Sequence, residues 1–287
     1  MLDLHSLEAF VAVSTHGSFS AAAERLHLTQ PAVSKRLQSL EQQIGSPLFD
    51  RVGRRIHLTD AGKTLLPAAQ RILQEVDNAN RTLQNLSLQV AGRLSFATSH
   101  HIGLHRLPQL LRDFIDQHPE VEVDPHFLES EVAHEAVQRR EVEFAFVTLI
   151  PRPPRAIEQI QLWTDPLVFV AARHHFLARK TRLQLNELCY TRAVLPHESS
   201  ATYQLIRQQF AQRQLPLKTT LPVNYLETIK MMVTVGLGWS VLPASMLDER
   251  LVQLPVDIPP VQRTLGVIRL RERTLSNAAS ALLDSLQ

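Results

Sequence analysis

Polar side chains of three kinds share one face of a predicted helix near the N-terminus. Gln30, Ser34 and Lys35 present an amide, a hydroxyl and an ammonium group, and Arg36 follows directly. A glutamine amide pairs best with adenine, whereas serine and lysine can contact a base or a phosphate. Arg36 is better suited to a phosphate. This pattern predicts a DNA-reading surface, and its alternative is an ordinary solvated helix face.

A basic hairpin is predicted shortly after this helix, with Gly53 at its tip. Arg51, Arg54 and Arg55 flank the tip and suit contacts to phosphates or to the minor groove, which position a protein without reading sequence. Arg51 has a structural alternative as the partner of Asp50 or another acid. The candidate DNA contacts are Thr29, Gln30, Pro31, Ser34, Lys35, Arg36, Arg51, Arg54 and Arg55.

Three short helices are expected to hold these side chains in place. Apolar residues at helical spacing predict a first helix that ends at Gly17, and Ser18 or Ser20 can cap an alanine-rich second one. Thr29 is expected to cap the third helix, whose first turn carries a proline where the missing N–H costs nothing. Gly45 ends this helix. Its buried stripe is predicted to comprise Ala32, Val33, Leu37, Leu40 and Ile44.

A long helix is predicted from Thr59 and Asp60 to about Ser87. Its seam positions follow alternating steps of three and four, as in a coiled coil, and Asn80 takes an a-type position that can fix the register of a dimer. Pro67 predicts a kink in the early part. The alternative is one amphipathic helix that lies on its own domain. The seam comprises Leu66, Ala69, Leu73, Val76, Asn80 and Leu83.

The pattern changes after Ala91 and Gly92, which are typical of a hinge. Short apolar runs then alternate with amphipathic stretches, which predicts mainly parallel sheets covered by helices. Prolines at 151–154 separate two such sets, and two lobes of this type hold a ligand outside their strand ends. Strands are predicted at 94–98, 121–128, 143–149, 166–172, 220–224, 239–242 and 264–270, and helices at 102–117, 131–140, 199–213 and 226–235.

Composition excludes several classes of protein. The chain has 287 residues, 44% of them hydrophobic and 20% charged, with a formal net charge of +2, as in ordinary globular proteins. Residues 1–60 hold six basic and six acidic side chains, so any nucleic-acid contact depends on local arrangement. The single cysteine, Cys189, excludes an internal disulfide and a multi-cysteine zinc site. Without a signal-peptide pattern or a long uninterrupted apolar tract, a cytoplasmic protein that enters no membrane is expected.

A specific set of motifs runs in order along the chain. Its N-terminal part comprises Phe10, Gly17-Ser18-Phe19-Ser20, Ala22-Ala23, Leu26, Thr29-Gln30-Pro31-Ala32-Val33-Ser34, Leu40-Glu41, Gly45, Leu48-Phe49, Arg51, Leu58-Thr59 and Ala61-Gly62. A less sharp C-terminal part comprises Leu107-Pro108, His118-Pro119, Asp165-Pro166-Leu167-Val168, Val235-Gly236-Leu237-Gly238 and Leu242-Pro243. Together these motifs closely resemble the LysR-type transcriptional regulator family.

The resemblance implies a multidomain fold. Residues 1–60 would form an all-α winged helix-turn-helix, 61–90 a linker and dimerisation helix, and 91–287 a two-lobed α/β effector domain like type II periplasmic binding proteins. Lobe I would span about 91–162 and 268–287, and lobe II about 163–267. The implied partners are double-stranded promoter DNA, further copies of the chain in a homodimer and homotetramer, RNA polymerase and a small-molecule effector, with no cofactor.

The implied effector site lies between the lobes. Hydroxyl-rich helix starts at the predicted strand ends favour a small anion such as a carboxylate. Trp239 stands where the family more often has a small residue, a departure that leaves the identity of the effector open. The candidate effector contacts are Ser99, His100, Thr148, Ser199, Ser200, Thr202 and Tyr225.

Other functions fit the sequence less well. His100, His101 and His105 invite a metal site, but no carboxylate or thiol accompanies them at close spacing, so no metal is expected. Cys189 alone cannot form the internal disulfide of the family's peroxide sensors. Catalysis is not expected because the nucleophile-elbow, P-loop and zinc-protease motifs are missing. A solute-binding protein would have no use for residues 1–90.

Overall fold

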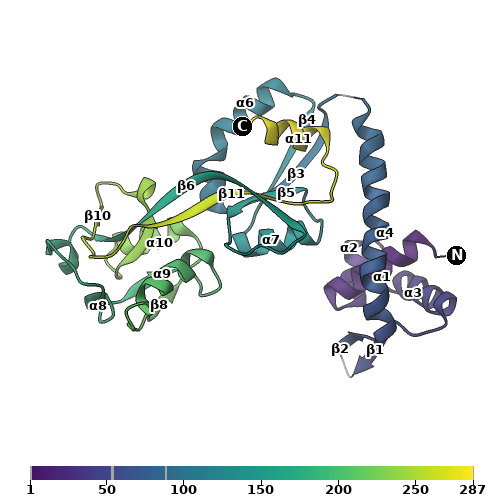
Figure 1. Ribbon diagram of the computed structural model, residues 1–287, viewed down its shortest axis with the longest axis horizontal. Coiled ribbons are helices and arrows are strands. Elements are labelled where there is room, and N and C mark those ends of the chain that lie inside the picture. The colour runs from purple at the N-terminus through teal and green to yellow at the C-terminus, as the bar shows by residue number, and fades with distance from the viewer. Residues whose placement is uncertain (1, 53–54, 88, 287) are drawn as a thin grey trace. The chain divides into compact units, whose positions relative to one another are not determined.

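The chain divides into two units, residues 1–88 and 89–287, in the computed structural model (Figure 1). The structure describes residues 2–52, 55–87 and 89–286. The predicted hairpin tip at Gly53 and the neighbouring Arg54 therefore lie outside the described residues.

Capping residues set the ends of the helices in the first unit. Asp3 accepts hydrogen bonds from the first turn of the first helix, and Gly17 ends that helix in the left-handed conformation. Ser18 and Thr29 cap the next two helices, and Gly45 ends the third with a φ of 75°. The elements are α1 (Leu4–His16), α2 (Phe19–Arg25), α3 (Gln30–Ile44), β1 (Phe49–Val52), β2 (Arg55–Leu58) and α4 (Asp60–Asn85).

One apolar core joins these helices. Phe10 of α1 is fully buried beside Val33 and Leu37 of α3, which fixes the rotation of α3 about its axis. Ala32 is only half-buried. The prediction that Ile44 is buried is wrong, because it lies in the last turn of α3, beyond the helices that cover the rest of the stripe.

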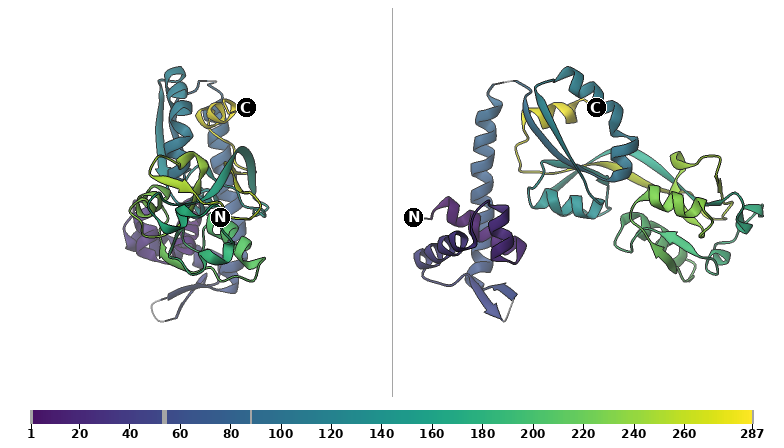
Figure 2. Two further views of the ribbon diagram at one scale, coloured as in Figure 1. Left: turned by 90° about the vertical axis from the view of Figure 1, so that its left-hand side faces the viewer. Right: turned by 180° about the vertical axis from the view of Figure 1, so that it is seen from behind.

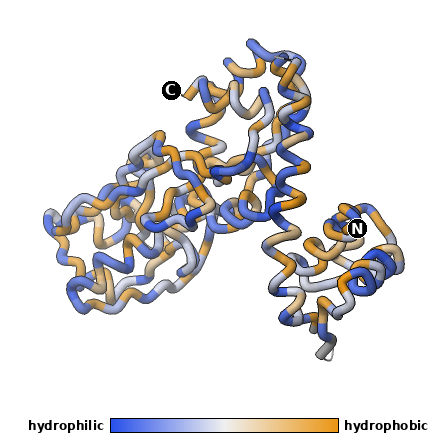
Figure 3. The backbone as a smooth tube through the Cα atoms, turned by 45° about the vertical axis from the view of Figure 1, so that its right-hand side comes forward, coloured by the Kyte–Doolittle hydropathy of each residue, from blue (hydrophilic) through white to orange (hydrophobic). Residues whose placement is uncertain are grey.

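Helix α4 changes character along its length. Ala69 is fully buried in the core, and Leu66 and Leu73 pack against it, so the first part of the predicted seam lies on its own domain. Asn80 is exposed and Leu83 is 66% exposed. Figure 3 shows polar and apolar residues alternating along the helix. Among the described residues, neither α4 nor another helix combines the length and apolar character that crossing a membrane requires.

The second unit contains two sets of alternating strands and helices. Its strands are β3 (Gly92–Thr98), β4 (Val121–Phe127), β5 (Phe144–Thr148), β6 (Ile157–Ala172), β7 (Ala193–Leu195), β8 (Thr219–Pro222), β9 (Ser240–Pro243), β10 (Leu251–Gln253) and β11 (Val261–Leu270). Its helices are α5 (His100–His105), α6 (Leu107–Gln117), α7 (Ser130–Gln138), α8 (Leu185–Leu188), α9 (Ala201–Ala211), α10 (Leu226–Thr234) and α11 (Asn277–Asp284), with short 3₁₀ turns at Phe176–Arg179 and Ala244–Met246.

The break between α5 and α6 corrects the prediction of one helix over 102–117. Pro108 occupies the first turn of α6, and it cannot donate a backbone hydrogen bond to the preceding turn. Arg106 stays in the right-handed helical region but with a φ of -119°, and it separates the two helices. This break places Arg106 at the end of α5.

The main sheet is mixed, so the prediction of mainly parallel sheets is wrong. Strands pair in the order β10–β6–β11–β5–β3–β4, with β9 also on β6. Strand β3 is parallel to β4 and β5, but β11 is antiparallel to β5 and β6, and β6 is antiparallel to β9 and β10. The reason is that β6 and β11 pass between the lobes as one long antiparallel pair.

These crossing strands join two separate cores. Phe96 and Phe144 stack in lobe I with ring centroids 5.4 Å apart, and Phe210 and Trp239 stack in lobe II at 6.0 Å. Figures 1 and 2 show β6 and β11 running side by side from one lobe to the other. The buried indole of Trp239 donates to the carbonyl of Leu188, so this residue serves the core of lobe II.

Gly266 generates a prediction about the crossing pair. It lies where the register between β11 and β6 shifts, and a Cβ there would be 2.0 Å from the carbonyl oxygen of Ile160. Because that oxygen is backbone, we expect Gly266→Ala to lower the free energy of unfolding of this unit by about 1–3 kcal/mol. Both tryptophans, Trp163 and Trp239, belong to this unit, so urea unfolding followed by tryptophan fluorescence measures it.

Gly103→Ala is the matched control. Its Cβ would meet mainly the ring of Phe127, which is an exposed side chain with room to move, and alanine favours the helix that Gly103 occupies. This variant should lose less stability than Gly266→Ala. Equal losses in the two variants would contradict the role assigned to the close strand contact.

Candidate functional site

The polar face of α3 is accessible. Gln30, Pro31 and Lys35 are exposed, and Ser34 and Arg36 are half-buried. The opposite face is held in the core, so these five side chains present a fixed array to solvent. The hydroxyl of Thr29 accepts a bond from the backbone of the first turn, which makes it the cap predicted from the sequence.

Hydrogen bonds attach the hairpin to α3 and α4. Glu41 of α3 accepts from the backbone of Leu48 at 2.7 Å, and Thr59 donates to the carbonyl of Pro47 at 2.7 Å. Gly62 packs so closely that a Cβ would be 2.3 Å from the carbonyl oxygen of Leu48. These contacts fix the position of β1 and β2, whose backbones carry Arg51 and Arg55.

A pocket lies between the two lobes of the second unit. Its free volume is about 580 Å³ when the space open to solvent is included. Six of the seven predicted effector contacts line it, namely Ser99, His100, Thr148, Ser200, Thr202 and Tyr225. Ser199 does not line it, since it is exposed and its hydroxyl pairs with His197 Nδ1 at 2.9 Å. The ring of His100 meets Tyr225 edge-on, with ring centroids 4.5 Å apart.

Arg263 also lines the pocket, and sequence reasoning missed it. It is 7% exposed on β11, and its Nε donates to Asp165 Oδ2 at 2.8 Å. Its Nη1 donates to the Thr202 hydroxyl at 3.0 Å, while Nη2 has no hydrogen-bond partner among the described residues. Burial lowers the pKa of Arg263 and the Asp165 carboxylate opposes that shift, so the guanidinium stays charged. The available signal was an arginine directly before the predicted strand at 264–270.

At this pocket, carboxylates of lobe I accept hydrogen bonds from donor groups of lobe II. Glu131 Oε1 accepts from the backbone N–H of Ala201 at 2.9 Å, at the start of α9. Glu129 Oε1 accepts from the side-chain amide of Asn224 at 2.6 Å. Sequence reasoning missed both acids, because their partners are 70 and 95 residues away along the chain. These contacts hold the lobes together at the rim.

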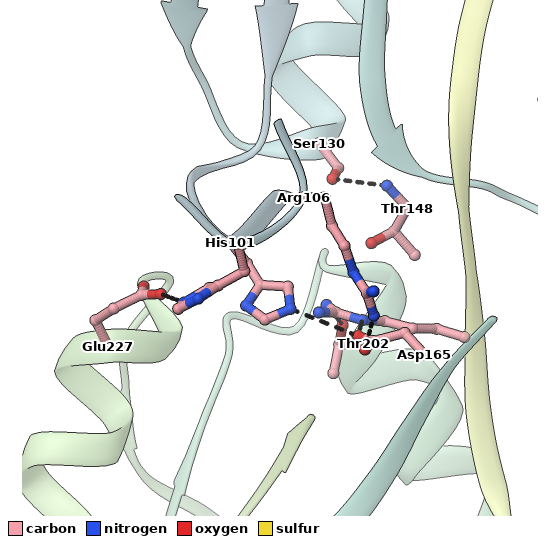
Figure 4. Close-up of polar contacts among 9 residues, drawn as sticks. His101, Arg106, Ser130, Thr148, Asp165, Thr202 and Glu227 are labelled. Atoms are coloured by element: carbon pink, nitrogen blue, oxygen red, sulfur yellow. Dashed lines mark hydrogen bonds and ion pairs between the residues drawn. The ribbon is translucent and has the colours of Figure 1, made fainter. Parts of the chain in front are cut away.

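Histidines of α5 meet an acid from lobe II. His105 Nε2 lies 3.1 Å from Glu227 Oε1, and the buried His101 has Nε2 3.8 Å from Asp165 Oδ2 (Figure 4). Burial lowers the pKa of His101 to about 3, and the positive charge of Arg263 acts in the same direction. The sequence shows no carboxylate at close spacing, but the fold brings Glu227 to these histidines from α10.

The ion pair of Arg263 generates a prediction. Arg263→Met should lower the free energy of unfolding by about 3–5 kcal/mol, because the buried carboxylate of Asp165 loses its hydrogen-bonded charge partner and keeps only Arg106, whose Nη2 lies 3.8 Å away. The double variant Arg263→Met with Asp165→Leu should recover much of that loss, since it removes both buried charges. Urea unfolding of the four proteins completes the cycle, and losses that simply add in the double variant would refute the coupling.

Comparisons with known proteins agree with this architecture. Residues 4–63 match the model of the bacterial regulatory helix-turn-helix protein, lysR family, and residues 87–287 match that of the LysR substrate binding domain. Over 99% of its length the chain is 30% identical to the transcriptional activator CmpR of Synechocystis, of which it covers 94%.

Solved structures show the same fold. An OxyR variant from Pseudomonas aeruginosa has a TM-score of 0.70 and 22% identity, covering 100% of this chain and 93% of that one. The regulatory domain of CcmR from Synechocystis, in complex with 2-PG, has a TM-score of 0.60 and 26% identity, covering 68% of this chain and 95% of that one. The chain therefore belongs to the LysR family of bacterial DNA-binding transcriptional regulators.

Proposed function

We propose that the exposed face of α3 reads operator DNA and that the basic hairpin contacts the DNA backbone. Gln30, Ser34 and Lys35 would contact base edges, and Arg36 would contact a phosphate. The observation that carries this proposal is the fixed, exposed array on α3, whose other face is buried in the core. Thr29 and Pro31, at the N-terminal end of α3, would lie close to the DNA. Arg51, Arg54 and Arg55 would supply the contacts of the hairpin to the DNA backbone.

Gln30→Ala should relax base preference and cost roughly 1–3 kcal/mol on the best operator, because one bidentate contact is lost. Gln42→Ala is the matched control, since it removes an exposed glutamine about 18 Å further along the same helix. Binding to a randomised operator library measures both variants. An unchanged base preference in Gln30→Ala, or an equal change in Gln42→Ala, would refute the assignment.

We propose a small anion, such as a carboxylate, as the effector. The Nη2 group of Arg263 supports this, since it is a buried, charged donor that lines the pocket without a partner among the described residues. Glu131 supplies a second argument, because its carboxylate already binds the N-terminal turn of α9. An effector anion would use the same donors and displace Glu131. The 2-PG complex of the CcmR regulatory domain provides an analogous occupant.

Displacement of Glu131 would transmit effector binding at the pocket to the DNA contacts. A ligand that competes with an inter-lobe contact favours one arrangement of the lobes over another, and only such a difference in affinity can shift a conformational equilibrium. The altered lobes would change how the copies of the chain present their α3 helices. We infer that this change of spacing alters the promoter contacts.

Glu131→Gln should bind anionic ligands more tightly than the wild type, by up to about tenfold, because the internal competitor loses its charge. Glu135→Gln is the control, since this exposed acid of the same helix pairs with Arg139 instead. A thermal-shift screen of small carboxylates and phosphates against neutral analogues measures the effect. Stabilisation by neutral compounds alone, or weaker anion binding in Glu131→Gln, would contradict the proposal.

We propose that the regulator acts as a homodimer and homotetramer in the cytoplasm, where its DNA lies, and contacts RNA polymerase at the promoter. The exposed Ile72, Leu83 and Leu86 of α4 and the following residues support self-association through this helix. We propose binding and not catalysis, because two of the serine hydroxyls at the pocket already accept hydrogen bonds from backbone N–H groups. Ser130 accepts from the N–H of Thr148, and Ser200 accepts from the first turn of α9.

A further inference from the structure

Three side chains with metal-binding groups converge beside the effector pocket. His101 and His105 lie one turn apart on α5 of lobe I, and Glu227 lies in the first turn of α10 of lobe II. One ligand atom from each lies within 4.8 Å of the other two. Figure 4 shows His101 and Glu227 on these two elements, with another side chain between them. The cluster therefore spans the lobes.

The imidazole of His101 is the unusual member of this cluster. It is 4% exposed, and neither ring nitrogen has a hydrogen-bond partner among the described residues. Buried polar atoms are nearly always partnered, so two orphaned nitrogens on one ring need an explanation. The 3.8 Å from Nε2 to Asp165 Oδ2 is too long for a hydrogen bond. An ion bound to this ring would supply the missing partner.

Asp165 has the position of a supporting carboxylate. Metal-binding histidines usually direct one ring nitrogen at the metal and the other at a carboxylate or carbonyl, which fixes the tautomer. With Nε2 directed at Asp165, the Nδ1 lone pair of His101 remains available for an ion. The same carboxylate also faces the guanidinium groups of Arg263 and Arg106, and it offsets part of the positive charge that would repel a cation.

We propose that His101, His105 and Glu227 bind one divalent transition-metal ion of the Zn²⁺ class. Two imidazoles and one carboxylate form a known three-ligand set for zinc, which leaves a fourth position open. Ligand atoms of a tetrahedral zinc site lie roughly 3.4 Å apart. His105 and Glu227 already approach to 3.1 Å, and both are part-exposed side chains that can rotate toward His101.

The metal would act as a clamp between the lobes. Its ligands come from α5 and α10, so occupancy favours the arrangement in which these helices are close. Because His101 also lines the effector pocket, metal and effector would influence each other's affinity. This inference goes beyond the proposed function and does not depend on it, since metal binding is measured without DNA and without an anion.

The experiment uses the full-length protein, stripped of metal by a chelator and titrated with Zn²⁺ alone in a calorimeter. We expect one ion per chain, and Co²⁺ as a spectroscopic probe should give the intense visible bands of a four-coordinate site. Glu227→Gln and His105→Ala should each weaken Zn²⁺ binding by at least about tenfold. Both positions are part-exposed, so the variants should fold, and circular dichroism checks this.

His126→Ala is the matched control. It removes an exposed imidazole that lies 2.9 Å from the carboxylate of Asp124, and this pair belongs to no three-ligand cluster in the part of the chain that the structure describes. This variant should bind Zn²⁺ as tightly as the wild type. Unchanged affinity in Glu227→Gln and His105→Ala would overturn the proposal, and so would an equal loss in His126→Ala.

Discussion

The arrangement of the effector unit depends on one charged pair buried where two strands cross. Arg263 of β11 and Asp165 of β6 are direct partners in the strand register, and both side chains are almost completely buried. Ions in such surroundings are tolerated only when they are paired and hydrogen-bonded. Since Arg263 also binds Thr202 of α9, the same pair connects the crossing strands to the wall of the pocket.

The lobes are joined differently at the pocket rim, through polar contacts that can exchange. Glu131 with the N–H of Ala201 and Glu227 with His105 each place an acid of one lobe against a donor of the other. Apolar packing is concentrated within each lobe instead, in separate clusters. The strands that cross between the lobes are fixed, whereas the polar contacts at the pocket rim can be replaced. A small ligand can therefore change the arrangement of the lobes without disturbing the apolar core of either one.

Features with a local cause could be predicted from the sequence. Thr29 and Gly45 delimit α3 because capping depends on adjacent residues, and Ser99 and Thr148 share a pocket because parallel strands end at one edge. Arg263 could not be assigned in this way, since its partner Asp165 is 98 residues away. The full length of β6 was also missed, because a proline such as Pro166 is typical of the start of a strand. In the structure β6 continues through Pro166, and near this residue its pairing changes from β11 to β9.

The bond between Glu131 and α9 has a consequence for the range of effector concentrations that the regulator detects. A carboxylate tethered beside its donor acts as a built-in competitor, and its effective concentration does not vary with the supply of effector. In the competition proposed above, an anion must therefore exceed a threshold that rises as the fraction of molecules with a free donor falls. In this proposal one residue of the pocket wall, Glu131, would tune the dose at which a promoter responds, while the groups that recognise the effector stay the same.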